Sequence, residues 1–199
     1  HVHVENAQGE QFEFDRVVVA TPTNKIESFL NNEQFADDIA LLKQFKFEQG
    51  ELVMHTDATV MPPQRKEWAV LSYMMDRNFT RQQFTVWLNA IEPTLVGKSP
   101  VFQTWRPVTA IDPKKIISSV ILTRAVVDSV TVKLNHQLQQ RHRAADRKVF
   151  YCGSWSCDGL PILESAVTSA MHIAEIFDAP LPFKGLKPKV EVAPELGYV

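Results

Sequence analysis

A stretch near the C-terminal end of the sequence has the residue order of a strand, a glycine turn and a helix start. Val149–Cys152 is apolar and rich in β-branched and aromatic residues, which is typical of a buried strand. Gly153 ends this run, and Gly159 and Pro161 predict a helix start with Pro161 in the first helical position. Such a turn exposes backbone N–H groups at the positive end of a helix dipole, which suits a phosphate or an electron-rich carbonyl. An ordinary strand–helix unit is the alternative.

The helix that follows is predicted to have one buried face. From Ile162 to Phe177 apolar residues recur every three or four positions. Cys152 and Cys157 flank the turn, and we expect them to be buried or pocket-lining thiols rather than a disulfide. A zinc site with this spacing would need two more ligands nearby, and none is evident, so we expect no metal site.

Other side chains could carry chemistry, but each has a structural alternative. His55 and Asp57 lie two apart on a predicted strand, so the histidine could act as a base oriented by the aspartate, or the pair could be a structural hydrogen bond. Four aromatic residues could line a substrate pocket or fill a core: Trp68, Tyr73, Trp87 and Trp105. His136 and His142 occupy a polar, basic stretch and are predicted to be solvated. The catalytic residues stay unknown.

Composition limits the class of protein. The 199 residues are 45% hydrophobic and 22% charged, with a net charge of −2, which is typical of a globular protein without an electrostatic footprint for nucleic acid. No apolar run approaches the roughly 18 residues that span a bilayer, so we expect no membrane span and a cytoplasmic protein. The chain opens at His1 as if within a strand, which favours a fragment of a longer protein.

Strand and helix patterns alternate along the chain. The sequence predicts strands at 1–5, 11–14, 17–20, 51–56, 68–74, 84–91, 101–105, 114–123 and 149–152. Helices are expected at 24–30, 33–45, 128–143 and 161–177. Val17–Ala20 and Val149–Cys152 both read as fully buried strands, so they could share one sheet with everything between them inserted.

Several segments together resemble the FAD-dependent amine oxidase superfamily. The resemblance covers about residues 2–178. It rests on Phe14-Asp-x-Val-Val-Val-Ala-Thr-Pro22, Val53-Met-His-Thr-Asp57 with Met61-Pro62, Arg65 and Trp68, Phe84-Thr-Val-Trp-Leu-Asn89, and Phe150-Tyr-Cys-Gly-Ser-Trp155. The resemblance implies an α+β fragment of a two-domain α/β flavoprotein. In it, 1–22 and 147–178 are pieces of the FAD-binding domain, 23–146 is an inserted substrate domain with a mixed sheet, and 179–199 is an extended tail.

The same resemblance implies cofactor contacts. They are Gly153, Ser154, Trp155, Gly159, Leu160, Pro161, Ile162 and Leu163, with Glu164 at the helix start complementing the dipole or serving the cofactor. The alternative for the turn is a helix cap with an aromatic core residue. The family's G-x-G-x-x-G motif is absent from this sequence, so a Rossmann half is the implied partner. The position after the strand glycine, acidic in many relatives, is Ser154.

The resemblance implies hydride transfer from a carbon of a small amine or lipid substrate to FAD. The fragment alone is expected to be inactive and to bind FAD weakly. Two alternatives stay open: a non-catalytic binding or interaction module, and an FAD-dependent desaturase or isomerase of an apolar lipid.

Overall fold

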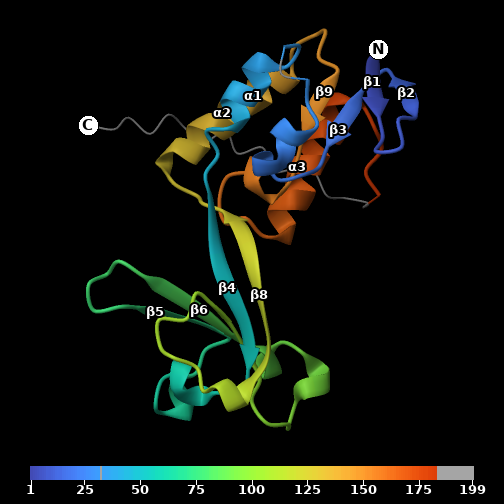
Figure 1. The fold of residues 1–199 in the computed structure, drawn as a ribbon. Helices are drawn as coiled ribbons and strands as arrows, with labels where there is room; N and C mark the ends of the chain where they lie inside the picture. Colours follow the sequence, from blue (N-terminus) through green and yellow to red (C-terminus); the bar gives the residue numbers. More distant parts are fainter. Residues whose placement is uncertain (32, 183–199) are drawn as a thin grey trace, which may run out of the picture. The chain divides into compact units, whose positions relative to one another are not determined.

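The chain forms two compact units. The computed structural model describes residues 1–31 and 33–182, so most of the expected tail 179–199 lies outside the described residues. Unit 1 comprises His1–Phe47 and the described residues from Ala125 onward, and unit 2 is Glu48–Arg124. Both contain strands and helical turns (Figure 1), so the α+β class is as expected.

Unit 1 is built around two short parallel strands that are far apart in the sequence. Strand β3, Val17–Val19, pairs with β9, Val149–Tyr151, with Val17 opposite Val149 and Val19 opposite Tyr151. The expected pairing of these segments in one sheet is confirmed. Full burial is confirmed for β9 but is wrong for β3, where Val18 is 42% exposed. Each strand has one neighbouring strand among the described residues, so the difference lies in the cover of their faces: Phe150 of β9 packs against Ile173, whereas Val18 of β3 stays open to solvent.

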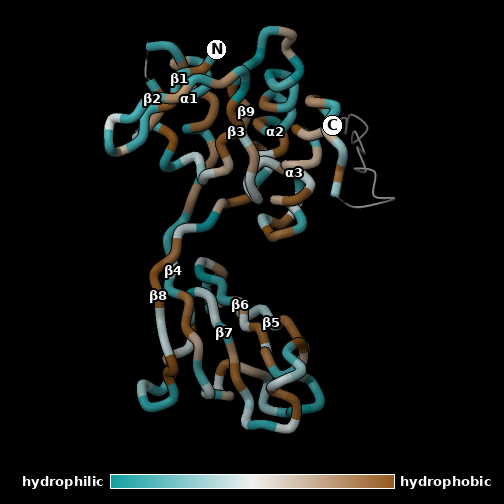
Figure 2. The backbone as a smooth tube through the Cα atoms, turned by 90° about the vertical axis from the view of Figure 1, so that its right-hand side faces the viewer, coloured by the Kyte–Doolittle hydropathy of each residue, from teal (hydrophilic) through white to brown (hydrophobic). Residues whose placement is uncertain are grey.

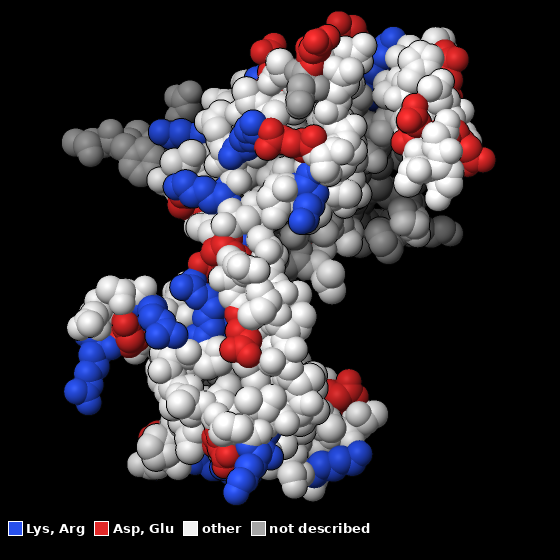
Figure 3. All heavy atoms as spheres, viewed as in Figure 1, with Lys and Arg blue, Asp and Glu red and all other residues white. Residues whose placement is uncertain are grey.

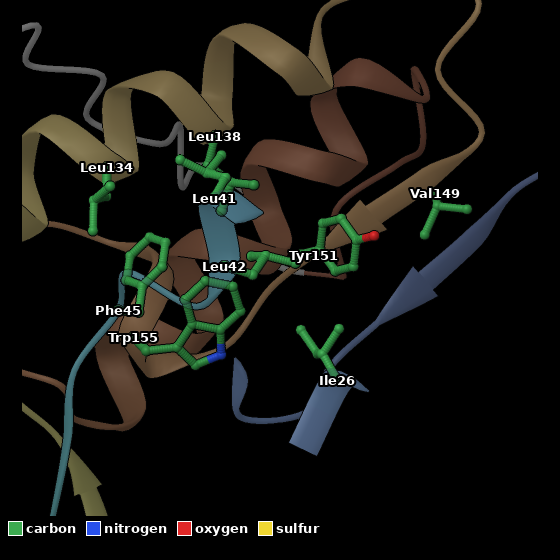
Figure 4. Packing of buried hydrophobic residues seen from close by; sticks show 9 residues of the cluster. All are labelled: Ile26, Leu41, Leu42, Phe45, Leu134, Leu138, Val149, Tyr151 and Trp155. Carbon is green, nitrogen blue, oxygen red and sulfur yellow. The ribbon is translucent and has the colours of Figure 1, made fainter. Parts of the chain in front are cut away.

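Strand β9 is buried on both faces. Val149 and Tyr151 point into a cluster that Figure 4 shows between the strand pair and helices α1, Ala36–Leu42, and α2, Ser129–His142. Phe150 points to the opposite face and packs against Ile173 of helix α3, Leu163–Ile176. Helices therefore cover both faces of β9, as parallel strands require. The members of the larger cluster are Ile26, Leu41, Leu42, Phe45, Leu134, Leu138, Val149, Tyr151 and Trp155.

One helix of unit 1 has the expected bounds to within one residue, and two others differ from the sequence prediction. Helix α2 was expected at 128–143, and the Asp128 side chain caps it by accepting the N–H groups of Val130 and Thr131. The helix expected at 33–45 is shorter, because the Asn31 side chain holds the N–H groups of residues 33 and 34 in a turn. The helix expected at 24–30 is a 3-10 helix, Thr23–Ser28.

A hairpin opens unit 1, as expected. Strands β1, Val2–Glu5, and β2, Gln11–Phe14, pair antiparallel. Gly9, with φ of +80°, completes the turn that joins them. Two aromatic side chains of β2 stay about half exposed, Phe12 at 47% and Phe14 at 46%.

Unit 2 contains a five-stranded sheet in the order β5-β6-β7-β4-β8. The strands are β4, Phe47–His55, β5, Leu71–Met75, β6, Gln82–Trp87, β7, Phe102–Trp105, and β8, Ile116–Ala125. The pairs β5·β6, β6·β7 and β4·β7 are antiparallel. Figure 2 shows hydrophobic residues along β8, which forms one edge of this sheet.

Two expectations for unit 2 need correction. The strand expected at 84–91 ends at Trp87, because Leu88–Ala90 forms a 3-10 turn in which the Asn89 side chain accepts the N–H of Val101 over 2.7 Å. The strand expected at 68–74 begins only at Leu71.

The boundaries of the two compact units differ from the domain boundaries that the resemblance implies. Residues 23–47 and 125–146 belong to unit 1 rather than to a domain spanning 23–146. The physical reason is that Ile26, Leu41 and Leu134 are core residues of the cluster built on β9. None of the described helices is long and apolar enough to span a membrane.

Candidate functional site

The turn after β9 is held by its own backbone and by one serine of α3. The N–H of Gly153 donates to Ser169 Oγ over 3.0 Å, and Ser169 in turn donates to the carbonyl of Ala166. Gly153 has φ of +150°, and a Cβ there would lie 2.6 Å from Trp155 Nε1. Only glycine fits this turn, and its N–H is already used.

Trp155 is a core residue of unit 1. Its side chain is 3% exposed, its Nε1 donates to the carbonyl of Thr21 over 3.1 Å, and its ring meets Phe45 edge-on with centroids 4.9 Å apart. Trp155 is therefore an aromatic core residue, which was the alternative to a cofactor contact. Ser154, in the 3-10 turn Ser154–Ser156, is partly accessible.

The segment before α3 is apolar and open to solvent. Leu160 is 64%, Ile162 51% and Leu163 86% exposed, and Pro161 is partly exposed. Gly159 has φ of +92° with no atom near the place of a Cβ. The Ser165 hydroxyl donates to the carbonyl of Leu160 over 2.6 Å, which ties the segment to the helix.

Helix α3 begins without a side-chain cap. The helix starts at Leu163, so the expectation that Pro161 takes the first helical position is wrong; Ile162 is the N-cap and is extended, with φ of −112° and ψ of 178°. The first intrahelical bond runs from the N–H of Ala166 to the carbonyl of Ile162. The N–H groups of residues 163–165 therefore have no partner within the helix. Exposed Glu164 complements the positive helix end.

The chemistry that this segment can provide is binding rather than proton transfer. Unpaired N–H groups and a positive helix end attract a carbonyl oxygen or an anion, and exposed leucine and isoleucine side chains suit an apolar planar group. Neither Cys152 nor Cys157 adds a nucleophile, because both are buried free thiols. Burial raises both pKa values, that of Cys157 to about 11. Among the described residues no group of His, Cys, Asp or Glu could hold a metal ion.

In unit 2 the His55–Asp57 pair is structural. Strand β4 ends at His55, and Asp57 lies beyond it, so the two do not share a strand face. His55 Nδ1 accepts the N–H of Asp57 over 3.1 Å, which leaves Nε2–H to donate to Thr104 Oγ1 over 2.8 Å. With both nitrogens occupied and the ring fully buried, no lone pair is free to act as a base. Burial, partly opposed by Asp57, lowers the pKa of His55.

Asp57 anchors two loops instead. Its carboxylate accepts the N–H groups of Thr59 and Asp112 and pairs with Lys115 Nζ at 3.1 Å. Burial acts to raise the pKa of Asp57, but these hydrogen bonds outweigh it and hold the pKa far below its ordinary value.

The four aromatic residues separate into core and surface. Trp68 and Trp87 pack with Phe102 on one face of the sheet, and Trp105 is 3% exposed on the other. Tyr73 was expected in the core or a pocket and is 62% exposed. It belongs to a cross-strand row that continues through Phe84, Trp105 and Leu52, so this face is covered at its centre and open toward β5.

Two buried polar side chains of unit 1, His142 and Asp38, have no obvious signal in the local sequence. His136 is exposed as expected, but solvation of His142 is wrong, because its ring is buried and Nε2 accepts the N–H of Tyr151 over 3.1 Å. A weak signal for His142 is its four-residue spacing from Leu134 and Leu138 on the same helix face. Asp38, also buried, binds Arg147 and Tyr151. Elsewhere charges of both signs are interspersed on the face shown in Figure 3.

Comparison with known proteins supports the fold only. No protein-family model and no curated protein matches the chain. The amine oxidase resemblance thus has no family model behind it. A solved structure, "Crystal structure of reduced UDP-Galactopyranose mutase", is similar with a TM-score of 0.54 and 10% sequence identity. The match covers 88% of this chain and 44% of that one, so this chain spans less than half of the mutase.

Proposed function

We propose that the chain is the C-terminal portion of an FAD-dependent oxidoreductase of the amine oxidase type. The observation that carries this proposal is the uncapped start of α3 beside three exposed apolar side chains, Leu160, Ile162 and Leu163. This arrangement follows directly on β9, which pairs with β3, in the order that the resemblance implies. The likeness to the mutase adds support for a flavoprotein-type fold.

The residues at the start of α3 fit a flavin ring. The ring has apolar faces and electron-rich carbonyls, and the chain offers apolar side chains next to unpaired N–H groups at residues 163–165. When bound, FAD would accept a hydride from a substrate carbon. In this account Leu160, Ile162 and Leu163 exclude water from the cofactor, and the N–H groups orient it.

Two of the expected cofactor residues take a different part in this proposal. Trp155 is enclosed in the core and Gly153 uses its N–H internally, so both position the turn without touching the cofactor. Ser154 remains a proposed contact, because it is partly accessible. The proposed contact surface is thus Ser154 together with residues 159–165.

The binding site for the FAD diphosphate is proposed to lie on a separate Rossmann half. None of the glycines of this chain forms a G-x-G-x-x-G motif. We therefore propose weak FAD binding by the chain alone, and tight binding only with that half.

Unit 2 is proposed to contact a small substrate, an amine or a lipid. The open sheet face beside Tyr73 and Phe84 continues through Leu71 and Val86, which are cross-strand neighbours. Its apolar side chains are exposed or half-buried and suit the hydrocarbon part of a substrate.

A flavin-dependent isomerase is the second candidate. The similar solved structure is titled a UDP-galactopyranose mutase in reduced form, and a mutase rearranges its substrate. Product analysis separates the two candidates, because an oxidoreductase removes two electrons from its substrate and an isomerase releases a product of the same oxidation state. A non-catalytic module would do neither.

The test is cofactor content in the complete reading frame that contains this chain. We expect FAD to copurify at one per chain and Leu163→Asp to lower this occupancy strongly. Leu163 is 86% exposed, so the substitution does not disturb the core. Val132→Asp on α2, at a position 45% exposed, is the matched control and should retain the cofactor. Absence of flavin, or equal occupancy in the two variants, would overturn the proposal.

A further inference from the structure

A second site lies in unit 1, at the C-terminal ends of α2 and α3. It is a pocket of about 230 Å³. Its lining residues are Gln139, His142, Arg143, His172, Glu175 and Ile176. His172 follows Leu163 by nine residues, or about 14 Å along the helix, so the pocket is separate from the proposed cofactor surface.

The pocket has opposite charges on its two walls. Arg143 comes from the end of α2 and Glu175 from α3, and neither takes part in an ion pair within the part of the chain that the structure describes. The charges of both residues act on His172, which lines the same pocket. Burial is the main cause that lowers the pKa of His172; Glu175 acts to raise it, Arg143 lowers it further, and Asp158, outside the pocket lining, acts weakly to raise it.

Two imidazoles line the same pocket with unused hydrogen-bonding capacity. Both ring nitrogens of His172 are buried without a partner, a state that typically costs about 1–3 kcal/mol for an unsatisfied polar group. In His142 the Nε2 atom accepts the N–H of Tyr151, so the neutral ring carries its proton on Nδ1 as a donor. A ligand in the pocket can supply partners to these groups.

We propose that this pocket binds a small zwitterion, such as a short amino acid, with its carboxylate next to Arg143 and its ammonium group next to Glu175. An anion alone would face the Glu175 carboxylate, and a cation alone would face the Arg143 guanidinium, so a ligand with both charges matches the walls best. The volume is below the usual range of about 300–1,000 Å³ for drug-sized ligands, which limits the ligand to a few heavy atoms.

The test uses the full chain at pH 7 and three probes: glycine with both charges, acetate with the negative one and methylammonium with the positive one. The readout is the NMR signals of the histidine rings. Glycine should shift the signals of His142 and His172 saturably, with a dissociation constant on the order of 1 mM. Acetate and methylammonium should each bind at least about tenfold more weakly than glycine.

Three variants complete the test. Arg143→Gln and Glu175→Gln should each weaken glycine binding about tenfold. Lys133→Gln removes an exposed charge of α2 outside the pocket and should leave binding unchanged. The proposal is overturned if no probe gives a saturable shift, if acetate binds as well as glycine, or if the three variants behave alike. Flavin binding plays no part in this outcome.

Discussion

The hydroxyl of Tyr151 donates a hydrogen bond to a carboxylate oxygen of Asp38 over 2.8 Å. Tyr151 lies on β9 and Asp38 on α1, and both side chains are buried. Arg147 also binds Asp38, with its Nη1 3.0 Å from Oδ1. This network joins a helix from the first segment of unit 1 to the strand that precedes the candidate site.

Removing the Asp38 charge should destabilise unit 1. Asp38→Asn leaves the largely buried Arg147 guanidinium without its counter-charge, and we expect a loss of about 3 kcal/mol in the free energy of unfolding. Denaturant unfolding measures this loss. The matched control is Asp37→Asn, an exposed neighbour on the same helix, for which we expect a change within about 0.5 kcal/mol. Equal effects of the two substitutions would contradict a specific role for the network.

The same network predicts a response to acid. Burial acts to raise the pKa of Asp38, but hydrogen bonds from Arg147 and Tyr151 outweigh it and lower the pKa below its ordinary value of 3.8. A carboxyl group with a lowered pKa stabilises the fold above its unfolded pKa, and this contribution is lost as pH falls through the folded value. Below about pH 4, Asp38→Asn should therefore lose less stability on acidification than the unchanged chain.

His142 predicts a pH dependence in a higher range. Burial, with a contribution from Arg147, lowers its pKa from 6.5 to about 4. The unfolded chain then binds a proton that the folded chain does not, so stability is complete above pH 6.5 and falls as pH drops toward 4. Between pH 6 and 5, His142→Gln should reduce the slope by up to about 1.4 kcal/mol per pH unit.

Chemical unfolding at several pH values provides this slope. His136→Gln is the control, because its imidazole is exposed on the same helix. The account of His142 fails if the two substitutions change the slope equally.

Thr104 is the centre of a buried hydrogen-bonded row in unit 2. Its hydroxyl lies 2.8 Å from His55 Nε2 and 2.9 Å from Thr85 Oγ1. Thr104→Val keeps the shape but leaves both partners unsatisfied, so we expect a loss of about 1–3 kcal/mol by thermal or chemical unfolding. Thr123→Val, at an exposed position of β8, should be nearly neutral. A neutral Thr104→Val would show that the row adds no stability.

The sequence patterns predicted those elements whose signals are local and strong. Val17–Val19 and Val149–Tyr151 are continuous apolar runs typical of parallel strands, and they pair with each other although only the second is fully buried. Asp128 is a strong N-cap, and α2 begins directly after it.

Other features depend on tertiary contacts that local patterns do not contain. Alternation in β5 shows that Tyr73 shares a face with its second neighbours, but not whether anything covers that face. For the candidate site, too, the local sequence predicts some features and tertiary contacts decide others. The exposed segment 159–163 was located from Gly159 and Pro161, whereas the enclosure of Trp155 depends on Phe45 and Thr21, which are distant in sequence.

The most direct test of the central claim is an amide NMR titration of this chain with FAD. We expect weak binding, with a dissociation constant on the order of 1 mM, and the largest shifts confined to Ser154 and residues 159–165. Val132→Asp should give the same shifts, and Leu163→Asp should reduce them. Shifts located elsewhere, no shifts at millimolar FAD, or tight one-to-one binding without a Rossmann half would contradict the account.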